Sequence, residues 1–127
     1  DTVVEVAAFA LGELGTGTEG GTDGAEDLPT APRSVAALTE VATGHRDALC
    51  REAAVAALGA IGHPAGLPAV LTGCGDRANV RRRAVLALSA FEGSRVTTML
   101  ERLCTDRDLQ VSQAAEDLLA IELGEDI

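Results

Sequence analysis

Apolar residues recur along the chain at the spacing of an amphipathic helix, and this helical pattern is itself repeated. The copies align when Arg51, Arg81 and Ser112 are placed in one column, at spacings of 30 and 31 residues. Aliphatic residues follow three, six and seven positions later in every copy: Ala54, Ala57 and Leu58, then Ala84, Ala87 and Leu88, then Ala115, Leu118 and Leu119. A stripe of this period predicts one helix per copy, with these residues facing a shared core.

Shorter helical patterns lie between the striped segments. They cover roughly Pro32 to Thr43, Pro64 to Cys74 and Ser94 to Cys104. Pro32 and Pro64 lie where proline is tolerated, in the first turn of a helix, and Pro68 is expected to shorten its helix. Each striped segment follows a polar turn that contains aspartate, a residue that favours the start of a helix. We therefore expect helical hairpins, each made of a shorter A helix followed by a striped B helix.

A partial copy of the pattern opens the chain. The sequence Leu-Gly-Glu-Leu-Gly at 11–15 matches Leu-Gly-Ala-Ile-Gly at 58–62 and predicts a first B helix with no A helix before it. Residues 16–31 contain four acidic residues, no basic residue and several glycines, which predicts a surface loop. A tolerated insertion is the favoured interpretation of this loop, and a partner-binding loop is the alternative.

Together, these patterns predict a single all-α domain over residues 1–127 with seven helices. Because one repeat cannot bury its apolar face alone, we expect the chain to be a fragment of a longer protein.

The repeats resemble the HEAT-repeat superfamily, in the short form named after phycobilisome lyases. The resemblance is carried by residues 47–62 and 76–88, and more weakly by residues 106–119. It implies a right-handed α–α solenoid of helical hairpins with about three and a half repeats. It also implies a ladder between neighbouring repeats, formed by the turn aspartate and the B-helix arginine, which matches Asp47 with Arg51 and Asp76 with Arg81. Ser112 replaces the arginine in the third copy, so the ladder is expected to end there.

Charge and composition exclude some classes of function and predict a cellular location. The chain has 20 acidic residues against 10 basic ones, a formal net charge of −10, and two aromatic residues. An acidic domain without stacking aromatics is a poor candidate for nucleic-acid binding, although Arg81 to Arg83 form one basic run. No apolar stretch approaches the ~20 residues of a membrane span. Three cysteines and no visible signal peptide predict a reducing, cytoplasmic location, and the Arg-, Ala- and Gly-rich composition is typical of a bacterial protein with GC-rich genes.

Catalytic and metal-binding patterns are weak. His45 and His63 could bind a metal with Cys50 or Cys74, but no metal-ligand spacing is present, and turn or helix-end roles are favoured. Cys74 and Cys104 occupy equivalent positions, which packing explains better than reactivity. We therefore expect no catalytic residue, metal or cofactor. The enzymatic alternative, taken from the resemblance, is a subunit or domain of a bilin lyase or isomerase.

The B helices also predict a face for binding. Positions one and five residues after the arginine column lie opposite the core stripe, and in solenoids of this type the B helices line the concave surface. The predicted partner-binding residues are Phe9, Glu52, Arg82, Leu86, Gln113 and Asp117. Phe9 has an alternative role, packing on a preceding repeat or beneath the insertion. An apolar residue among charged ones suits a protein or peptide partner rather than nucleic acid or membrane, and the oligomeric state stays open.

Overall fold

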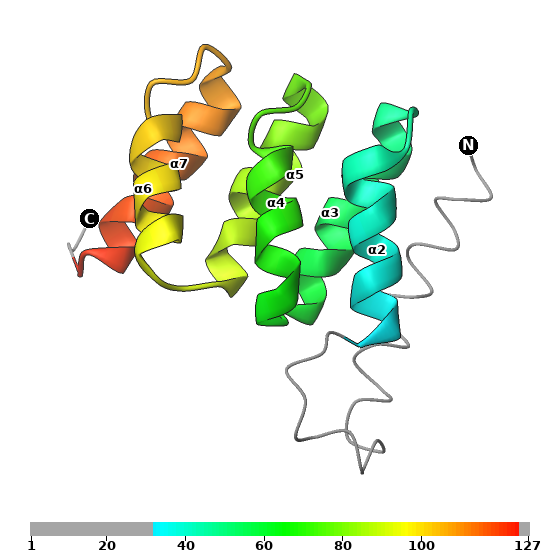
Figure 1. Cartoon of the computed structure of the whole chain (residues 1–127). Helices are drawn as coiled ribbons and strands as arrows, with labels where there is room; N and C mark the ends of the chain where they lie inside the picture. The colour runs from blue at the N-terminus through cyan, green and yellow to red at the C-terminus, as the bar shows by residue number, and fades with distance from the viewer. Residues whose placement is uncertain (1–31, 125–127) are drawn as a thin grey trace.

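The computed structural model describes residues 32–124, and this part of the chain is all helical, without a strand (Figure 1). Its six α-helices are α2 (Arg33–Gly44), α3 (Ala48–Ile61), α4 (Leu67–Gly73), α5 (Ala78–Ala87), α6 (Ser94–Leu103) and α7 (Leu109–Glu122), and its short 3-10 helices are η2 (Pro64–Gly66) and η3 (Leu88–Ala90). The prediction of an all-α repeat fold is confirmed. The predicted first helix, the insertion at 16–31 and Phe9 lie outside the described residues.

The helices form three hairpins stacked side by side in two layers (Figure 1). The A helices are α2, α4 and α6, and the B helices are α3, α5 and α7. Each A helix packs on the B helix of its own hairpin, and the B helices pack on one another in the order α3, α5, α7. In the A layer, α2 packs on α4, whereas α4 and α6 have little contact. The continuous row is therefore the B layer.

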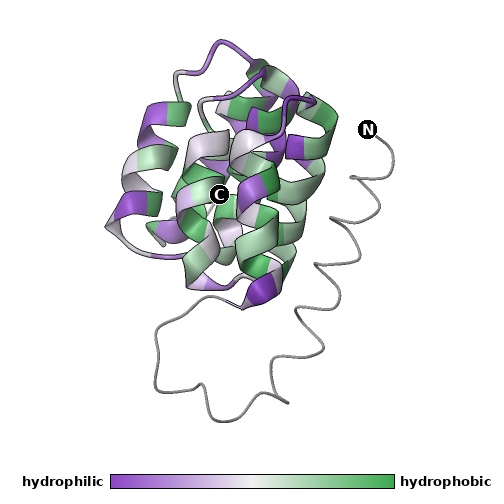
Figure 2. Cartoon of the chain, turned by 45° about the vertical axis from the view of Figure 1, so that its right-hand side comes forward, coloured by the Kyte–Doolittle hydropathy of each residue, from purple (hydrophilic) through white to green (hydrophobic). Residues whose placement is uncertain are grey.

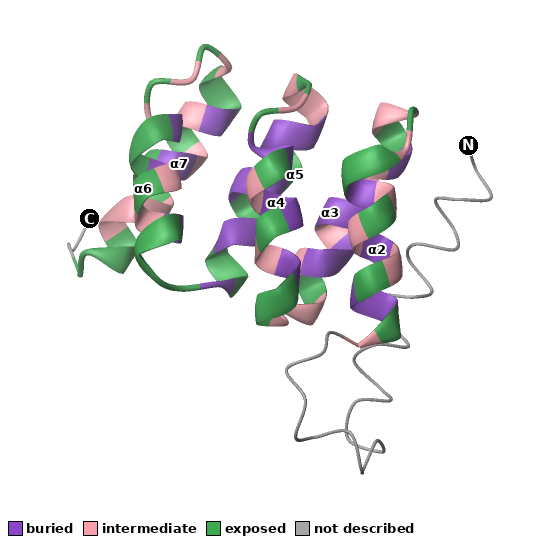
Figure 3. Ribbon diagram, in the orientation of Figure 1, coloured by how far each residue is buried: buried purple, intermediate pink, exposed green. Residues whose placement is uncertain are grey.

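The predicted core stripe is buried between the layers (Figure 3). Ala54 and Ala84 are fully buried, and Leu58 and Leu88 are each only 1% exposed. Figure 2 shows the complementary pattern, with hydrophilic turns at the upper end of the stack. The third copy is less well covered, because Leu118 and Leu119 are only partly buried and no described helix packs on the far side of α7.

Proline and glycine determine where α4 begins and how closely α3 approaches α5. Pro64 is the first residue of η2 and Pro68 is the second residue of α4, so this A helix is reduced to seven residues. Gly59 lies on the side of α3 that faces α5. A Cβ at Gly59 would lie 2.7 Å from the Cβ of Ala87, which places Gly59 in the contact between α3 and α5. Only a residue without a side chain fits this approach.

Candidate functional site

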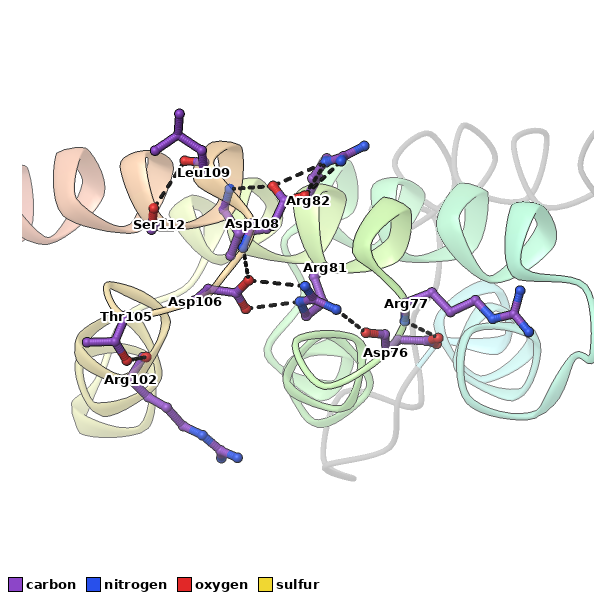
Figure 4. Close-up of polar contacts among 11 residues, drawn as sticks. Asp76, Arg77, Arg81, Arg82, Arg102, Thr105, Asp106, Asp108, Leu109 and Ser112 are labelled. Carbon is purple, nitrogen blue, oxygen red and sulfur yellow. Dashed lines mark hydrogen bonds and ion pairs between the residues drawn. The ribbon is translucent and has the colours of Figure 1, made fainter.

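Two arginines at the beginnings of α3 and α5 connect successive repeats. Arg51 donates from Nε and Nη2 to the carboxylate of Asp76 at 2.7 and 2.9 Å, and from Nη1 to the carbonyl of His45 at 2.7 Å. Arg81 repeats the arrangement one hairpin later. It donates to the carboxylate of Asp106 at 3.0 and 3.1 Å and to the carbonyl of Asp76 at 2.8 Å (Figure 4). Each guanidinium therefore holds the backbone of its own turn and the carboxylate of the next.

This geometry corrects the predicted ladder pairs by one repeat. Asp47 was matched with Arg51 and Asp76 with Arg81, but each arginine binds the aspartate of the following turn. The physical reason is reach: the long side chain leaves the first turn of its helix toward the next hairpin, while its own turn offers a carbonyl. Asp47 instead accepts from the amide of Leu49 at 2.9 Å and caps α3. Asp106 was not among the predicted ladder residues, although its place in the third polar turn was a signal for it.

The ladder carboxylates are held in their ionised form. The hydrogen bond from Arg51 is the main reason that the pKa of Asp76 is lowered. Burial works to raise the pKa of Asp106, but the bonds from Arg81 and from the amide of Asp108 outweigh it and leave the pKa lowered. Paired arginine and aspartate side chains are between 11% and 17% exposed, so water screens them only partly. In the third copy, Ser112 donates to the carbonyl of Leu109.

A second, more exposed set of polar pairs crosses the B layer. Arg82 donates from Nη2 to Asp108 at 2.7 Å, which connects α5 to the turn before α7 (Figure 4). Arg83 points the other way and donates to Glu52 at 3.2 Å. Glu52 also accepts a hydrogen bond from the side-chain amide, Nδ2, of Asn79 at 2.9 Å. Together with Arg81, every arginine of the basic run is therefore paired with a carboxylate of the chain.

Five of the six predicted binding residues lie within the described chain, on the row of B helices. Leu86 is 55% exposed on α5, and Arg82 lies one turn before it, also exposed. Gln113 and Asp117 are exposed on α7. Glu52 on α3 is half-buried beneath its contacts with Asn79 and Arg83. The predicted residues therefore lie on three adjacent helices, α3, α5 and α7. Two of the charged side chains, Glu52 and Arg82, already form contacts within the chain.

The histidines and cysteines have structural positions. Nδ1 of His45 accepts from the amide of Asp47, and Nδ1 of His63 accepts from the amide of Ala65, each at 3.0 Å. Among residues 32–124 no group of three potential ligands could hold a metal ion. Cys50 is fully buried, and burial raises the pKa of Cys74 to about 12, so this thiol stays protonated. Both histidines therefore use Nδ1 to stabilise their own turns, and Cys74 is a buried core residue.

Within the described part of the chain, no helix combines the length and the apolar character needed to cross a membrane.

Comparison with known proteins identifies the fold family. The family model of HEAT repeats matches residues 35–120, which covers all three hairpins. No curated protein and no solved structure matches the chain. The family match concerns HEAT repeats in general, so the short lyase-type subtype stays a prediction. The extent of the match and the stacked hairpins agree, and the chain belongs to the HEAT-repeat family.

Proposed function

We propose that this domain is a non-catalytic scaffold that binds a protein or peptide partner on the exposed face of α3, α5 and α7. HEAT repeats generally serve as surfaces for protein interaction, which supports the class of function. The B layer is continuous while the A layer opens between α4 and α6, an arrangement that favours curvature toward the B side.

The observation that carries the proposal is the exposure of Leu86. This leucine lies on the middle helix of the row, 55% exposed, with Arg82 beside it and the half-buried Glu52 on the neighbouring helix. A central apolar side chain surrounded by polar ones can serve as the anchor that a partner buries. The bonds between Arg82 and Asp108 and between Arg83 and Glu52 hold the helices of this face in one arrangement, which lowers the conformational cost of binding.

Substitution of Leu86 tests the proposal. Leu86→Asp is expected to abolish photocrosslinking of a protein partner from an adjacent position on α5, because a carboxylate replaces the apolar contact. Ala36→Asp is the matched control, since Ala36 is also an exposed apolar residue but lies on α2, in the A layer. If both variants crosslink the partner as the unmodified chain does, the B face is not the binding surface. Transfer of a bilin by the chain, detected by absorbance, would contradict the non-catalytic part of the proposal.

A further inference from the structure

A recess lies in the A layer, on the side of the molecule away from the B-helix face. A cleft of about 310 Å³ separates α4 from α6 and is lined by Leu71, Ser94, Arg95, Thr98, Met99 and Arg102. It exists because α6 packs on α7 and has little contact with α4, whereas α2 and α4 close against each other. Figure 1 shows α4 and α6 as neighbours in the front layer of the stack.

One face of α6 borders this cleft. Four lining residues, Arg95, Thr98, Met99 and Arg102, are spaced as i, i+3, i+4 and i+7, so they share one side of the helix. The two arginines are then about 10 Å apart along the helix axis, since each residue adds ~1.5 Å. Met99 lies between them, and Leu71 of α4 lines the same cleft.

The arginines of the cleft differ from those of the ladders. Arg51, Arg81, Arg82 and Arg83 all form ion pairs inside the described structure. Arg95 and Arg102 are exposed and form no ion pair with any residue of 32–124. Figure 4 shows the Arg102 side chain extending away from α6, with no interaction between its guanidinium and the other residues drawn. Two arginines without an ion-pair partner among residues 32–124 therefore flank the apolar side chains of this cleft, in a chain with a net charge of −10.

We propose that this cleft binds an acidic amphipathic segment of a partner protein. The partner would place two carboxylates about 10 Å apart, one against each arginine, and an apolar side chain between them against Met99 and Leu71. A helix with acidic residues seven positions apart and leucine between them has this form. The overall negative charge of the chain does not prevent such binding, because charges beyond a Debye length of about 8 Å are largely screened.

A designed peptide pair tests the site. The probe is a fluorescein-labelled helical peptide with two glutamates seven positions apart and leucines between them, and its companion has lysines in place of the glutamates. The full chain is expected to bind the glutamate peptide saturably in an anisotropy titration, with amide shifts confined to α4 and α6. Arg95→Glu combined with Arg102→Glu should weaken this binding at least about tenfold, as expected for reversing two partly exposed charge pairs.

Three controls separate the site from general charge effects. Arg46→Glu with Arg107→Glu changes the same number of exposed arginines elsewhere and should alter affinity less than about twofold. Arg95→Glu combined with Arg102→Glu should gain affinity for the lysine peptide, and this gain also shows that the variant is folded. Leu86→Asp, on the B face, should leave binding unchanged, so this result is independent of the proposed function. The inference is overturned by any of four results: no saturable binding, equal binding of the lysine peptide, shifts outside α4 and α6, or self-association of the chain through this cleft.

Discussion

The contacts α3–α5 and α5–α7 are made by equivalent helices of successive repeats, yet they are held together differently. Between α3 and α5 the backbones approach until Gly59 meets Ala87, and the interface is the more extensive of the two. Between α5 and α7 the contact is smaller, and two aspartates before α7, Asp106 and Asp108, bind arginines of α5. The repeat position of Ala87 is occupied in α7 by Leu118, a larger residue. The first two hairpins are also joined by two ion pairs, those of Arg51 with Asp76 and of Arg83 with Glu52. The comparison therefore shows that interfaces with the same number of ion pairs can differ in how closely their helices pack.

The largest effect is expected from filling the close approach between α3 and α5. Gly59→Val places a side chain against Ala87, whose Cβ and Cα would lie 2.7 and 3.0 Å from the new Cβ. Because the obstruction includes backbone, the helices must separate, and we expect a loss of about 1–3 kcal/mol in the free energy of unfolding. Urea denaturation measures this loss.

The control for this substitution lies in α2. No atom lies within 4 Å of a Cβ built at Gly44, so Gly44→Ala should change stability by less than about 1 kcal/mol. Ala87→Gly introduced together with Gly59→Val should recover part of the lost stability. Equal stability of Gly59→Val and the unmodified chain would show that α3 and α5 are not in close backbone contact.

The next largest effect is expected from removing a ladder arginine between α5 and α7. Arg81→Ala leaves the carboxylate of Asp106 without its guanidinium, and only 12% of that aspartate side chain is exposed to water. We expect a loss of about 2 kcal/mol in the free energy of unfolding, the usual cost of leaving a shielded charged group unpaired. Arg82→Ala is the comparison, since Arg82 is 45% exposed and its loss should cost clearly less. If Arg82→Ala were the more destabilising variant, Arg81 and Asp106 would not be the better shielded of the two pairs.

Acid should weaken the ladder at a predictable pH. The pKa values of Asp76 and Asp106 are lowered in the folded chain, so their contribution to stability is present at neutral pH and above the unfolded value of about 4. It is lost as the pH falls below about 4 and through the lowered folded values. Thermal unfolding between about pH 2.5 and pH 6 should show this loss in the unmodified chain. Asp76→Asn should flatten the acid limb, and an unchanged limb in this variant would show that Asp76 does not contribute.

The smallest effect is expected in the reactivity of the equivalent cysteines of the second and third hairpins. Cys74 is 5% exposed with a pKa raised to about 12, while Cys104 is half-buried. Cys104 should therefore react first with a maleimide in the folded chain, and Cys74 only as the chain unfolds. Mass spectrometry of the labelled peptides measures the order. Faster labelling of Cys74 would indicate that the second hairpin opens more readily than the third.

The sequence by itself determined the helices, their pairing into hairpins and the core stripe. Ala54, Leu58, Ala84 and Leu88 were identified from their spacing alone, because burial of one face of a helix leaves a local period in the sequence. That the chain is built from repeats followed from the spacing of about 30 residues between these helices. The local period also placed Leu86 opposite the stripe.

The tertiary structure alone decided which repeat each charged side chain contacts. Arg51 binds Asp76 and not Asp47, and the adjacent Arg82 and Arg83 bind in opposite directions along the stack. The close contact at Gly59 and the cleft beside Arg102 likewise exist only because of the way the helices stack. The physical reason is that the rise and rotation from one hairpin to the next depend on summed contacts between distant residues. Spacing along the chain records the face of a helix, but it does not record this step between repeats.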